Sequence, residues 1–307
     1  MLFLGIDGGG TKTKVYVINQ NKKVIYKGSG GPSSIDTVTN QETLKSINNA
    51  LINFFNKSEF ESTTFTAIFA GLGGVPSKKE QLILEKIIKK VKGASKNTLI
   101  IARSDMENAL ASGLLFDEGI TLIAGTGMVA YGKNKHGITA RAGGLGYKEG
   151  DLGSSYSLGK MAIQAVARAL DKRYPITPFT EELINHLKVK TPADIARLSE
   201  RWYEERTKVA ALAPYVTKHA DLNDKFAKKI CDQMSYELVL SVQSVYNQLK
   251  LDHPTLVVVG SLGNVDGYFK NRLHEQIHEF APDLKIISPQ VDPAYAAALL
   301  AHHYFYL

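Results

Sequence analysis

The chain of 307 residues contains a single cysteine, Cys231, and no apolar run long enough to cross a membrane. One cysteine excludes a disulfide within the chain and any multi-cysteine metal or iron–sulfur site. A membrane helix needs about 20 apolar residues in succession, so no membrane contact is predicted. The start MLFLGIDGGG has neither the basic region nor the long apolar stretch of a signal peptide. We therefore expect a cytoplasmic protein.

A dense basic stripe is also lacking, although the formal net charge is +7. The lysines lie in scattered patches such as KIIKKVKG (residues 86–93), with the spacing of the solvent-facing side of an amphipathic helix. No aromatic residues interleave with them, so nucleic-acid binding is not predicted, and small anionic substrates fit the charge equally well. Apolar residues make up 44% of the chain, and its length allows two domains of ordinary size.

The first half of the chain alternates between strand and helix signals. Three strand-like segments, MLFLGID, TKVYVIN and KKVIYKGSG, are followed by helical spacing over 44–55, a strand over 63–71 and a helix over 79–93. The strand NTLIIARS and the helix DMENALASGLL complete this half. Strands that alternate with helices predict an α/β fold with a mostly parallel sheet.

The pattern then starts again, with short strands over 119–125, 128–134 and 137–143. A long helical stretch follows, then a strand at TLVVVG, a helix over 268–280, a strand at LKIISP and a last helix from Pro293. We expect two related lobes: residues 1–115 with the tail 292–307, and residues 116–291 with a helical insertion at about 158–250. The alanines of the last helix are expected to pack on the first lobe; they are Ala294, Ala297, Ala298 and Ala301.

Three consecutive glycines interrupt the first strand pair, in GIDGGGTKT. Glycines let backbone N–H groups surround an anion, and Asp7 beside them would repel a phosphate unless a divalent cation such as Mg²⁺ lay between. The turn is neither a P-loop nor a dinucleotide fingerprint, because a strand follows it. A plain hairpin turn is the alternative. The candidate phosphate-binding residues are Gly8, Gly9, Gly10, Thr11, Lys12 and Thr13.

Two further glycine turns follow in the second half. Gly125, Thr126 and Gly127 again separate two apolar strand-like runs, and a pair of such turns on opposing lobes can hold a triphosphate from both sides. In VVVGSLGN the strand ends at Gly260 and Ser261, where backbone groups can contact a flat ring. An ordinary strand-to-helix turn explains the third segment equally well.

As a set, GIDGGGTKT, IAGTGM and VVVGSLGN resemble the phosphate-1, phosphate-2 and adenosine segments of the actin-like ATPase fold. Within that superfamily the chain resembles the BadF/BadG/BcrA/BcrD ATPase family, and most closely its N-acetylglucosamine kinase branch. The resemblance spans nearly the whole chain and is weakest between about Leu170 and Leu249. It implies two ribonuclease H-like lobes with a cleft between them, bound ATP and Mg²⁺, and adenosine contacts at Gly260, Ser261 and Leu262.

The resemblance also implies a catalytic base. ARSDMENALASG matches the family's strand that ends in Ser/Thr-Asp before a small-residue helix, in which Asp105 accepts the proton of the attacking sugar hydroxyl. A carboxylate at the carboxyl end of a strand suits that role. Helix capping by Asp105 or Ser104 is the structural alternative, and the two roles are compatible.

Other segments imply the sugar site. GGLGYKEGDLGS resembles the family's GGWGxxxGDEGS segment, with Leu145 and Leu152 in place of its tryptophan and glutamate. GPSSID resembles GPSxN, with Ile35 in place of asparagine; Asp36 either takes over hydroxyl binding or marks another amino sugar. The implied substrate residues are Ser34, Asp36, Gly73, Asp105, Gly143, Gly144, Leu145 and Asp151.

One motif competes with this interpretation. HEQIH, residues 274–278, satisfies the zinc pattern H-E-x-x-H. No Glu or Asp follows at the usual distance to act as the third ligand, although His302 or His303 could take that place. The dehydratase-activating branch of the family needs cysteine ligands that Cys231 alone does not supply. The cysteine-rich zinc motif of the ROK kinases is also missing.

The sequence therefore predicts an ATP-dependent kinase that phosphorylates the 6-hydroxyl of N-acetylglucosamine or N-acetylmuramic acid. Asp7 is expected to hold Mg²⁺ through water. The alternatives are a glucosamine kinase and an amino-sugar sensor with little turnover. The family resemblance implies a homodimer through the helical middle of the second lobe.

Overall fold

The computed structural model describes all 307 residues and divides them into two compact units. Unit 1 comprises Met1–Asp117 with Pro289–Leu307, and unit 2 comprises Glu118–Ser288. The chain thus leaves unit 1 after Asp117 and returns to it at Pro289. The sequence predicts the corresponding lobe boundaries after residues 115 and 291. No helix has both the length and the apolar character needed to span a membrane.

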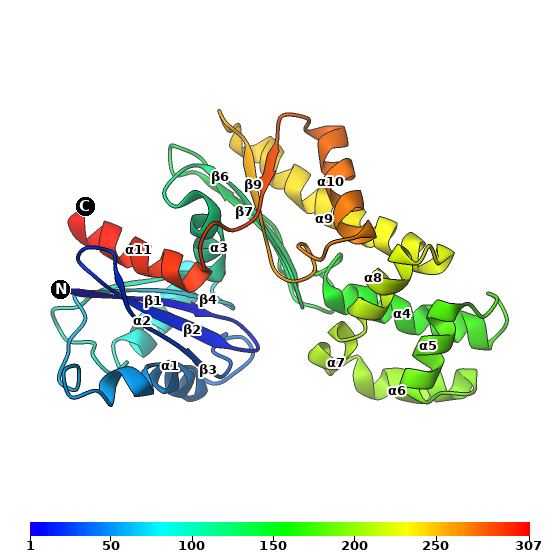
Figure 1. Cartoon of the computed structure of the whole chain (residues 1–307), viewed down its shortest axis with the longest axis horizontal. Helices are drawn as coiled ribbons and strands as arrows, with labels where there is room; N and C mark the ends of the chain where they lie inside the picture. The colour runs from blue at the N-terminus through cyan, green and yellow to red at the C-terminus, as the bar shows by residue number, and fades with distance from the viewer. The chain divides into compact units, whose positions relative to one another are not determined.

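Unit 1 is built on a five-stranded sheet of order β3-β2-β1-β4-β5 (Figure 1). β1 pairs antiparallel with β2 and β2 antiparallel with β3, whereas β1, β4 and β5 run parallel. The first three strands therefore form a meander, and the crossover strands extend the sheet on its other side. The strands are β1 (Leu2–Gly8), β2 (Thr13–Asn19), β3 (Val24–Gly30), β4 (Ala67–Leu72) and β5 (Leu99–Ser104).

Helices cover both faces of this sheet. Alternate residues of a strand point to opposite faces, so Leu4 and Ile6 belong to the core under α1 and α2, whereas Phe3 belongs to the core under α3 and α11. The glycine at position 5 lets α11 approach closely: a Cβ atom there would lie 2.1 Å from the backbone nitrogen of Ala298. The helices are α1 (Asn40–Phe55), α2 (Lys78–Ile88), α3 (Asp105–Leu114) and α11 (Pro293–Tyr306).

Local chemistry sets where these helices begin. α1 starts four residues before the predicted 44, because Thr39 caps it: Glu42 N donates to Thr39 Oγ1 over 3.2 Å, and Thr39 N donates to Glu42 Oε2 over 2.9 Å. This reciprocal pair satisfies two backbone donors that a helix terminus leaves open. α2 ends at Ile88, before the lysine-rich segment 89–93 that the sequence predicts as its last turn.

Unit 2 repeats the strand arrangement of unit 1. Its sheet has the order β10-β9-β6-β7-β8, with β6, β7 and β8 in an antiparallel meander and β6, β9 and β10 parallel. β6 therefore corresponds to β1, and each of these strands runs into a glycine turn. The strands are β6 (Gly119–Ala124), β7 (Met128–Lys133), β8 (Thr139–Gly143), β9 (Thr255–Val259) and β10 (Lys285–Ile287).

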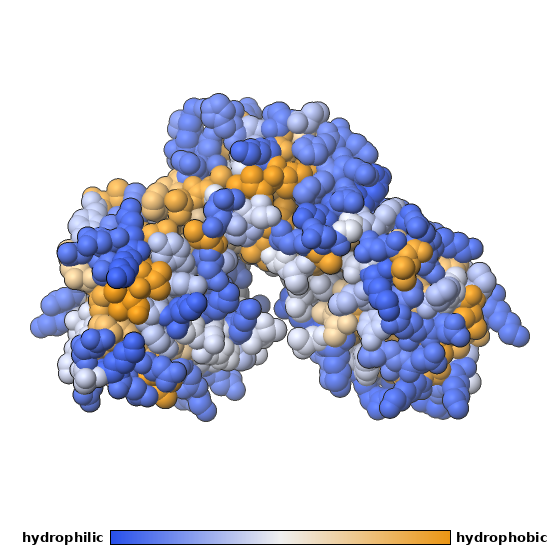
Figure 2. All heavy atoms as spheres, in the orientation of Figure 1, coloured by the Kyte–Doolittle hydropathy of each residue, from blue (hydrophilic) through white to orange (hydrophobic).

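A helical segment between β8 and β9 enlarges unit 2 (Figure 1). The long helix α9 packs on β7 and β8, and α10 packs on α9. The visible face of both units is mostly hydrophilic, with apolar residues in separate patches (Figure 2). The helices are α4 (Ser155–Leu170), α5 (Pro178–Leu187), α6 (Pro192–Trp202), α7 (Arg206–Ala210), α8 (Ala213–Asp221), α9 (Lys225–Leu249) and α10 (Tyr268–Phe280).

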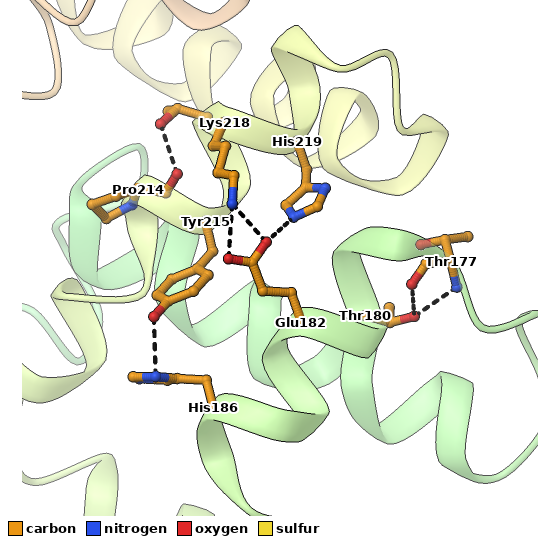
Figure 3. Close-up of polar contacts among 9 residues, drawn as sticks. Thr177, Thr180, Glu182, His186, Pro214, Tyr215, Lys218 and His219 are labelled. Carbon is orange, nitrogen blue, oxygen red and sulfur yellow. Dashed lines mark hydrogen bonds and ion pairs between the residues drawn. The ribbon is translucent and has the colours of Figure 1, made fainter.

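Polar side chains join α5 to α8 in what we call the α5–α8 cluster (Figure 3). Glu182 of α5 accepts from Lys218 Nζ over 2.8 Å and lies 2.5 Å from Nε2 of His219. Beside it, Tyr215 Oη lies 3.0 Å from Nδ1 of His186. The His219 side chain is buried, so Glu182 supplies a partner that solvent does not.

Candidate functional site

The first glycine turn connects β1 to β2 in unit 1. Gly9 N donates to the carbonyl of Lys12 over 3.0 Å, which closes the turn directly after Asp7. A Cβ atom on Gly8 would lie 2.0 Å from Ser33 Oγ, whereas beyond Gly8 and Gly10 no heavy atom lies within 4 Å of the corresponding position on Gly9. The turn is therefore packed at its base and open at Gly9, as a backbone cradle for an anion requires.

The side chains of this turn divide into two kinds. Thr11 and Lys12 are exposed, as is Gly10 at the tip. Thr13 is fully buried, and its Oγ1 lies 2.7 Å from both the Gly31 carbonyl and Ser33 Oγ. Thr13 thus fastens the turn to the segment after β3, while Thr11 remains accessible to a ligand.

The segment after β3 lies against this turn. The backbone nitrogens of Ser33 and Ser34 donate to the Gly9 carbonyl over 3.0 and 3.2 Å. Ser34 Oγ in turn donates to Asp36 Oδ1 over 2.5 Å. Asp36 is exposed, so its carboxylate can accept hydrogen bonds from a ligand as well.

Gly73, in the turn after β4, connects this segment to Asp105. Its nitrogen donates to the Gly8 carbonyl over 2.8 Å. A Cβ atom on Gly73 would lie 2.5 Å from Ser34 Oγ and 3.5 Å from Asp105 Oδ2. The structure thus brings Ser34, Asp36, Gly73 and Asp105 together beside the first glycine turn, although they come from three segments of the chain.

Asp105 is the first residue of α3, directly after β5. The capping role belongs to Ser104, whose Oγ accepts from Met106 N over 3.4 Å and donates to Asp105 Oδ1 over 3.0 Å. The half-buried Asp105 carboxylate therefore lies at the amino end of α3, the positive end of the helix dipole.

Asn108, one turn further along α3, is a residue that sequence reasoning missed. Its Nδ2 lies 3.1 Å from the Ile6 carbonyl, 2.9 Å from Asp7 Oδ1 and 3.0 Å from the Gly71 carbonyl. The side chain is completely buried and occupies the space above Gly71. A polar residue on the apolar side of a short helix was the available signal, because buried amides need partners.

Burial raises the pKa of Asp7 to about 7, the Asn108 hydrogen bond opposes this shift, and the negative charges of Asp105 and Asp292 add to it. Since neighbouring carboxylates raise the pKa of Asp7, a cation beside it would offset their negative charge. The donor set, carboxylate oxygen beside open backbone, is the kind that Mg²⁺ prefers. These residues therefore fit a water-mediated Mg²⁺ at Asp7.

The second glycine turn connects β6 to β7 in unit 2. Gly125 N donates to the Gly127 carbonyl over 2.9 Å, and Ser155 N, at the start of α4, donates to the Gly125 carbonyl over 2.8 Å. Thr126 between them is half-buried. The amino end of the sixteen-residue helix α4 therefore holds the turn in place, and the dipole of this helix favours anions near that end.

The third turn is anchored to the second. The nitrogens of Leu262 and Gly263 donate to the Ala124 carbonyl over 3.1 and 3.2 Å, directly before the second turn. Gly260 has φ +102°, and a Cβ atom there would lie 2.3 Å from that carbonyl. Leu262 is buried in the core of unit 2, whereas Ser261 is exposed.

The loop after β8 places its predicted residues differently. Gly143 and Gly144 adopt φ values of +74° and +66°, which favour glycine. Leu145 is 78% exposed, so its side chain forms no wall within unit 2. Asp151 is buried beside Gly127 and pairs with Arg206, whose Nη2 lies 3.2 Å from Asp151 Oδ2. Sequence reasoning missed Arg206, since it lies where the resemblance is weakest.

The competing zinc motif lies on α10. Glu275 Oε2 accepts from Arg272 Nη1 over 3.0 Å. No group of three His, Cys, Asp or Glu residues in the chain is arranged to hold a metal ion.

The repeated strand order and the glycine turns define the class of this protein: it has the actin-like ATPase fold found in sugar kinases. A crystal structure of a protein from Chromobacterium violaceum matches it with a TM-score of 0.79 at 22% identity, over 98% of each chain. A ROK family glucokinase from Streptomyces griseus, solved with glucose and AMPPNP, matches with a TM-score of 0.61 at 13% identity, over 99% of this chain and 100% of that one.

More particularly, the chain belongs to the BadF/BadG/BcrA/BcrD ATPase family, whose profile matches residues 4–301. It is 32% identical over 302 residues to an N-acetylmuramic acid/N-acetylglucosamine kinase from Clostridium acetobutylicum, covering 97% of each protein. It is 30% identical over 319 residues to an N-acetyl-D-glucosamine kinase from Dictyostelium discoideum, covering 98% of this chain and 97% of that protein. The predicted family is confirmed.

Proposed function

We propose that this chain is an ATP-dependent amino-sugar kinase that phosphorylates the 6-hydroxyl of N-acetylglucosamine or N-acetylmuramic acid. The observation that carries the proposal is the gathering of Ser34, Asp36, Gly73 and Asp105 beside the first glycine turn. The curated relatives, which match nearly the whole chain, carry the names of kinases for these sugars.

In the proposed reaction Asp105 is the base. Its carboxylate accepts the proton of the sugar 6-hydroxyl, whose oxygen forms a bond to the γ-phosphorus of ATP while the bond to the ADP oxygen breaks. Thr11, Thr126 and the turn amides hold the phosphates. Mg²⁺, when bound near Asp7, offsets the negative charge of the phosphates. Most of the rate enhancement then comes from positioning and charge stabilisation, as in other phosphoryl transfers.

In unit 1 the residues proposed to contact the sugar are Ser34, Asp36 and Gly73. In unit 2 the family resemblance separately assigns Asp151 and the loop Gly143–Leu145 to the sugar. Ile35 and Leu145 depart from the family pattern, so the choice of sugar has to be tested. The substrates to compare with N-acetylglucosamine are its two close relatives, N-acetylmuramic acid and glucosamine.

A coupled ADP-release assay over five sugars tests the function. N-acetylglucosamine and N-acetylmuramic acid should stimulate turnover well above glucosamine, N-acetylmannosamine and glucose. Phosphorus–proton coupling to the C6 protons of the product would locate the phosphate. Strongest stimulation by glucosamine would make the chain a glucosamine kinase. Tight sugar binding with no phosphorylated product would instead make it a nucleotide-binding sensor.

We further propose that the chain forms a homodimer through the helical middle of unit 2. Apolar side chains on the surface of α9 support this: Tyr236 is 51% exposed and Leu240, one turn later, is 40% exposed.

A further inference from the structure

Arg206 lies directly against the second glycine turn. A Cβ atom on Gly127 would lie 2.1 Å from Nη2 of Arg206, so the guanidinium occupies the space that any other residue at position 127 would fill. The same Nη2 donates to Asp151 Oδ2 over 3.2 Å. The absence of a side chain on Gly127 thus brings a cation into contact with the turn.

The guanidinium is only partly satisfied by the protein. The Arg206 side chain is 31% exposed and the Asp151 side chain 4%. Nε of Arg206 is buried and has no hydrogen-bond partner. The Tyr147 ring covers one side, with its centroid 5.7 Å from Cζ. A guanidinium carries five N–H donors, and a buried donor without an acceptor costs free energy that a ligand oxygen would recover.

We propose that Arg206 is an anion-binding residue of the second glycine turn and that it contacts the phosphate chain of the nucleotide. This inference rests on the proposed function, because it takes the Gly125–Gly127 turn as a phosphate site. The planar fork of a guanidinium matches phosphate oxygens, and its partial exposure leaves donors available to a ligand. Asp151 holds the fork beside the turn.

A carboxylate on an acidic sugar is the other anion that this cation could bind. The phosphate is favoured because Nη2 of Arg206 touches the turn itself at Gly127, although the same Nη2 also donates to Asp151 of the proposed sugar site. Phosphate groups also carry more charge than a single carboxylate, so the gain from pairing is larger.

Calorimetric binding of ATP, ADP and AMP to the full chain tests the proposal. Arg206→Gln should weaken ATP and ADP binding by about 10-fold to 100-fold, the range for a lost hydrogen bond to a charged group, and change AMP binding by less than about threefold. Arg206→Lys keeps the charge without the fork and should recover part of the affinity. Arg197→Gln is the matched control, since Arg197 is exposed on α6 and pairs with Asp194.

Two results would overturn the proposal. The first is an equal loss of affinity for ATP and AMP. The second is unchanged ATP affinity with a KM that rises for N-acetylmuramic acid but not for N-acetylglucosamine, which would assign Arg206 to the sugar. Thermal unfolding checks that each variant folds. If Arg206→Gln does not fold, the ATP and AMP affinities of Arg206→Lys test the proposal instead. If the wild type phosphorylates no sugar, but Arg206→Gln still loses more affinity for ATP than for AMP, the kinase proposal fails and this inference stands.

Discussion

At the scale of single residues, the buried amide of Asn108 organises the candidate site of unit 1. It bonds to the ends of β1 and β4 and to the Asp7 carboxylate, and so fixes how α3 sits on the sheet. Asp105 is three residues earlier on the same helix, so its position relative to Asp7 follows from this contact. A buried amide hydrogen bond specifies geometry strongly, because the alternative is an unsatisfied polar group.

We expect Asp105→Asn to abolish transfer while ATP still binds. Removal of a general base costs about 10²-fold to 10⁴-fold in rate. An amide at this position retains the size of the carboxylate but accepts no proton. The measurement is kcat from coupled ADP release, with ATP affinity from calorimetry.

Glu107→Gln is the matched control, because Glu107 lies in the same helical turn and pairs with Arg103 over 3.5 Å. It should keep kcat near that of the wild type. Wild-type turnover by Asp105→Asn would show that the base has been assigned wrongly.

At the scale of secondary-structure elements, the α5–α8 cluster shows how polar contacts connect helices of the inserted segment (Figure 3). Hydrogen bonds from Lys218, then from His219, hold the pKa of Glu182 below its usual range. A carboxylate whose folded-state pKa is lowered contributes stability that is present above its unfolded pKa and is lost as pH falls through the folded value. The α5–α8 contact should therefore weaken in acid.

Glu182→Gln should lower Tm at pH 7 by about 2 °C, since a partly exposed ion pair contributes about 1 kcal/mol or less. The difference from the wild type should shrink in acid, as the pH falls below the ordinary pKa of glutamate and through the lowered pKa of folded Glu182. Thermal unfolding followed by circular dichroism at several pH values measures both effects. Glu200→Gln, an exposed glutamate on α6, is the control and should shift Tm little at any pH. A Tm difference that persists unchanged into acid would contradict the ion-pair explanation.

At the scale of the whole molecule, the two units share one strand order but differ in what covers their sheets. Unit 1 is completed by α11 from the far end of the chain, whereas unit 2 carries the additional helices α4–α9 between β8 and β9. An insertion of this kind adds surface without altering the sheet that supports the glycine turns. It is therefore where we expect contacts with a second copy of the chain.

Leu240→Asp should convert the proposed dimer to a monomer, because a charge at an apolar interface is costly to bury. Light scattering after size-exclusion chromatography measures the mass. Leu82→Asp is the control: Leu82 is 48% exposed on α2 of unit 1 and should not change the mass. A wild-type chain that elutes as a monomer at micromolar concentration would refute the dimer.

The periodicity of the sequence predicted which helices and strands exist better than it predicted the residues at which they begin and end. The helix from Tyr268 to Phe280 agrees at both ends, since apolar spacing and flanking breakers mark it. α1 begins before its predicted start, because its capping residues precede the apolar pattern. The α/β fold class and the family are confirmed, because glycine turns beside apolar strands are local features that a sequence displays directly.

Side-chain neighbours in the folded chain were harder to predict. The sequence by itself determined the alternation of strands with helices and the three glycine turns, because each depends on residues close together in the chain. The role of Asp105 as base stays a prediction from the family resemblance. Only the tertiary structure decided that Asn108 bonds to Asp7, that Thr13 is buried and that Arg206 lies on Gly127. Those contacts join residues tens of positions apart, and their geometry follows from how helices pack on a sheet, which no local pattern encodes.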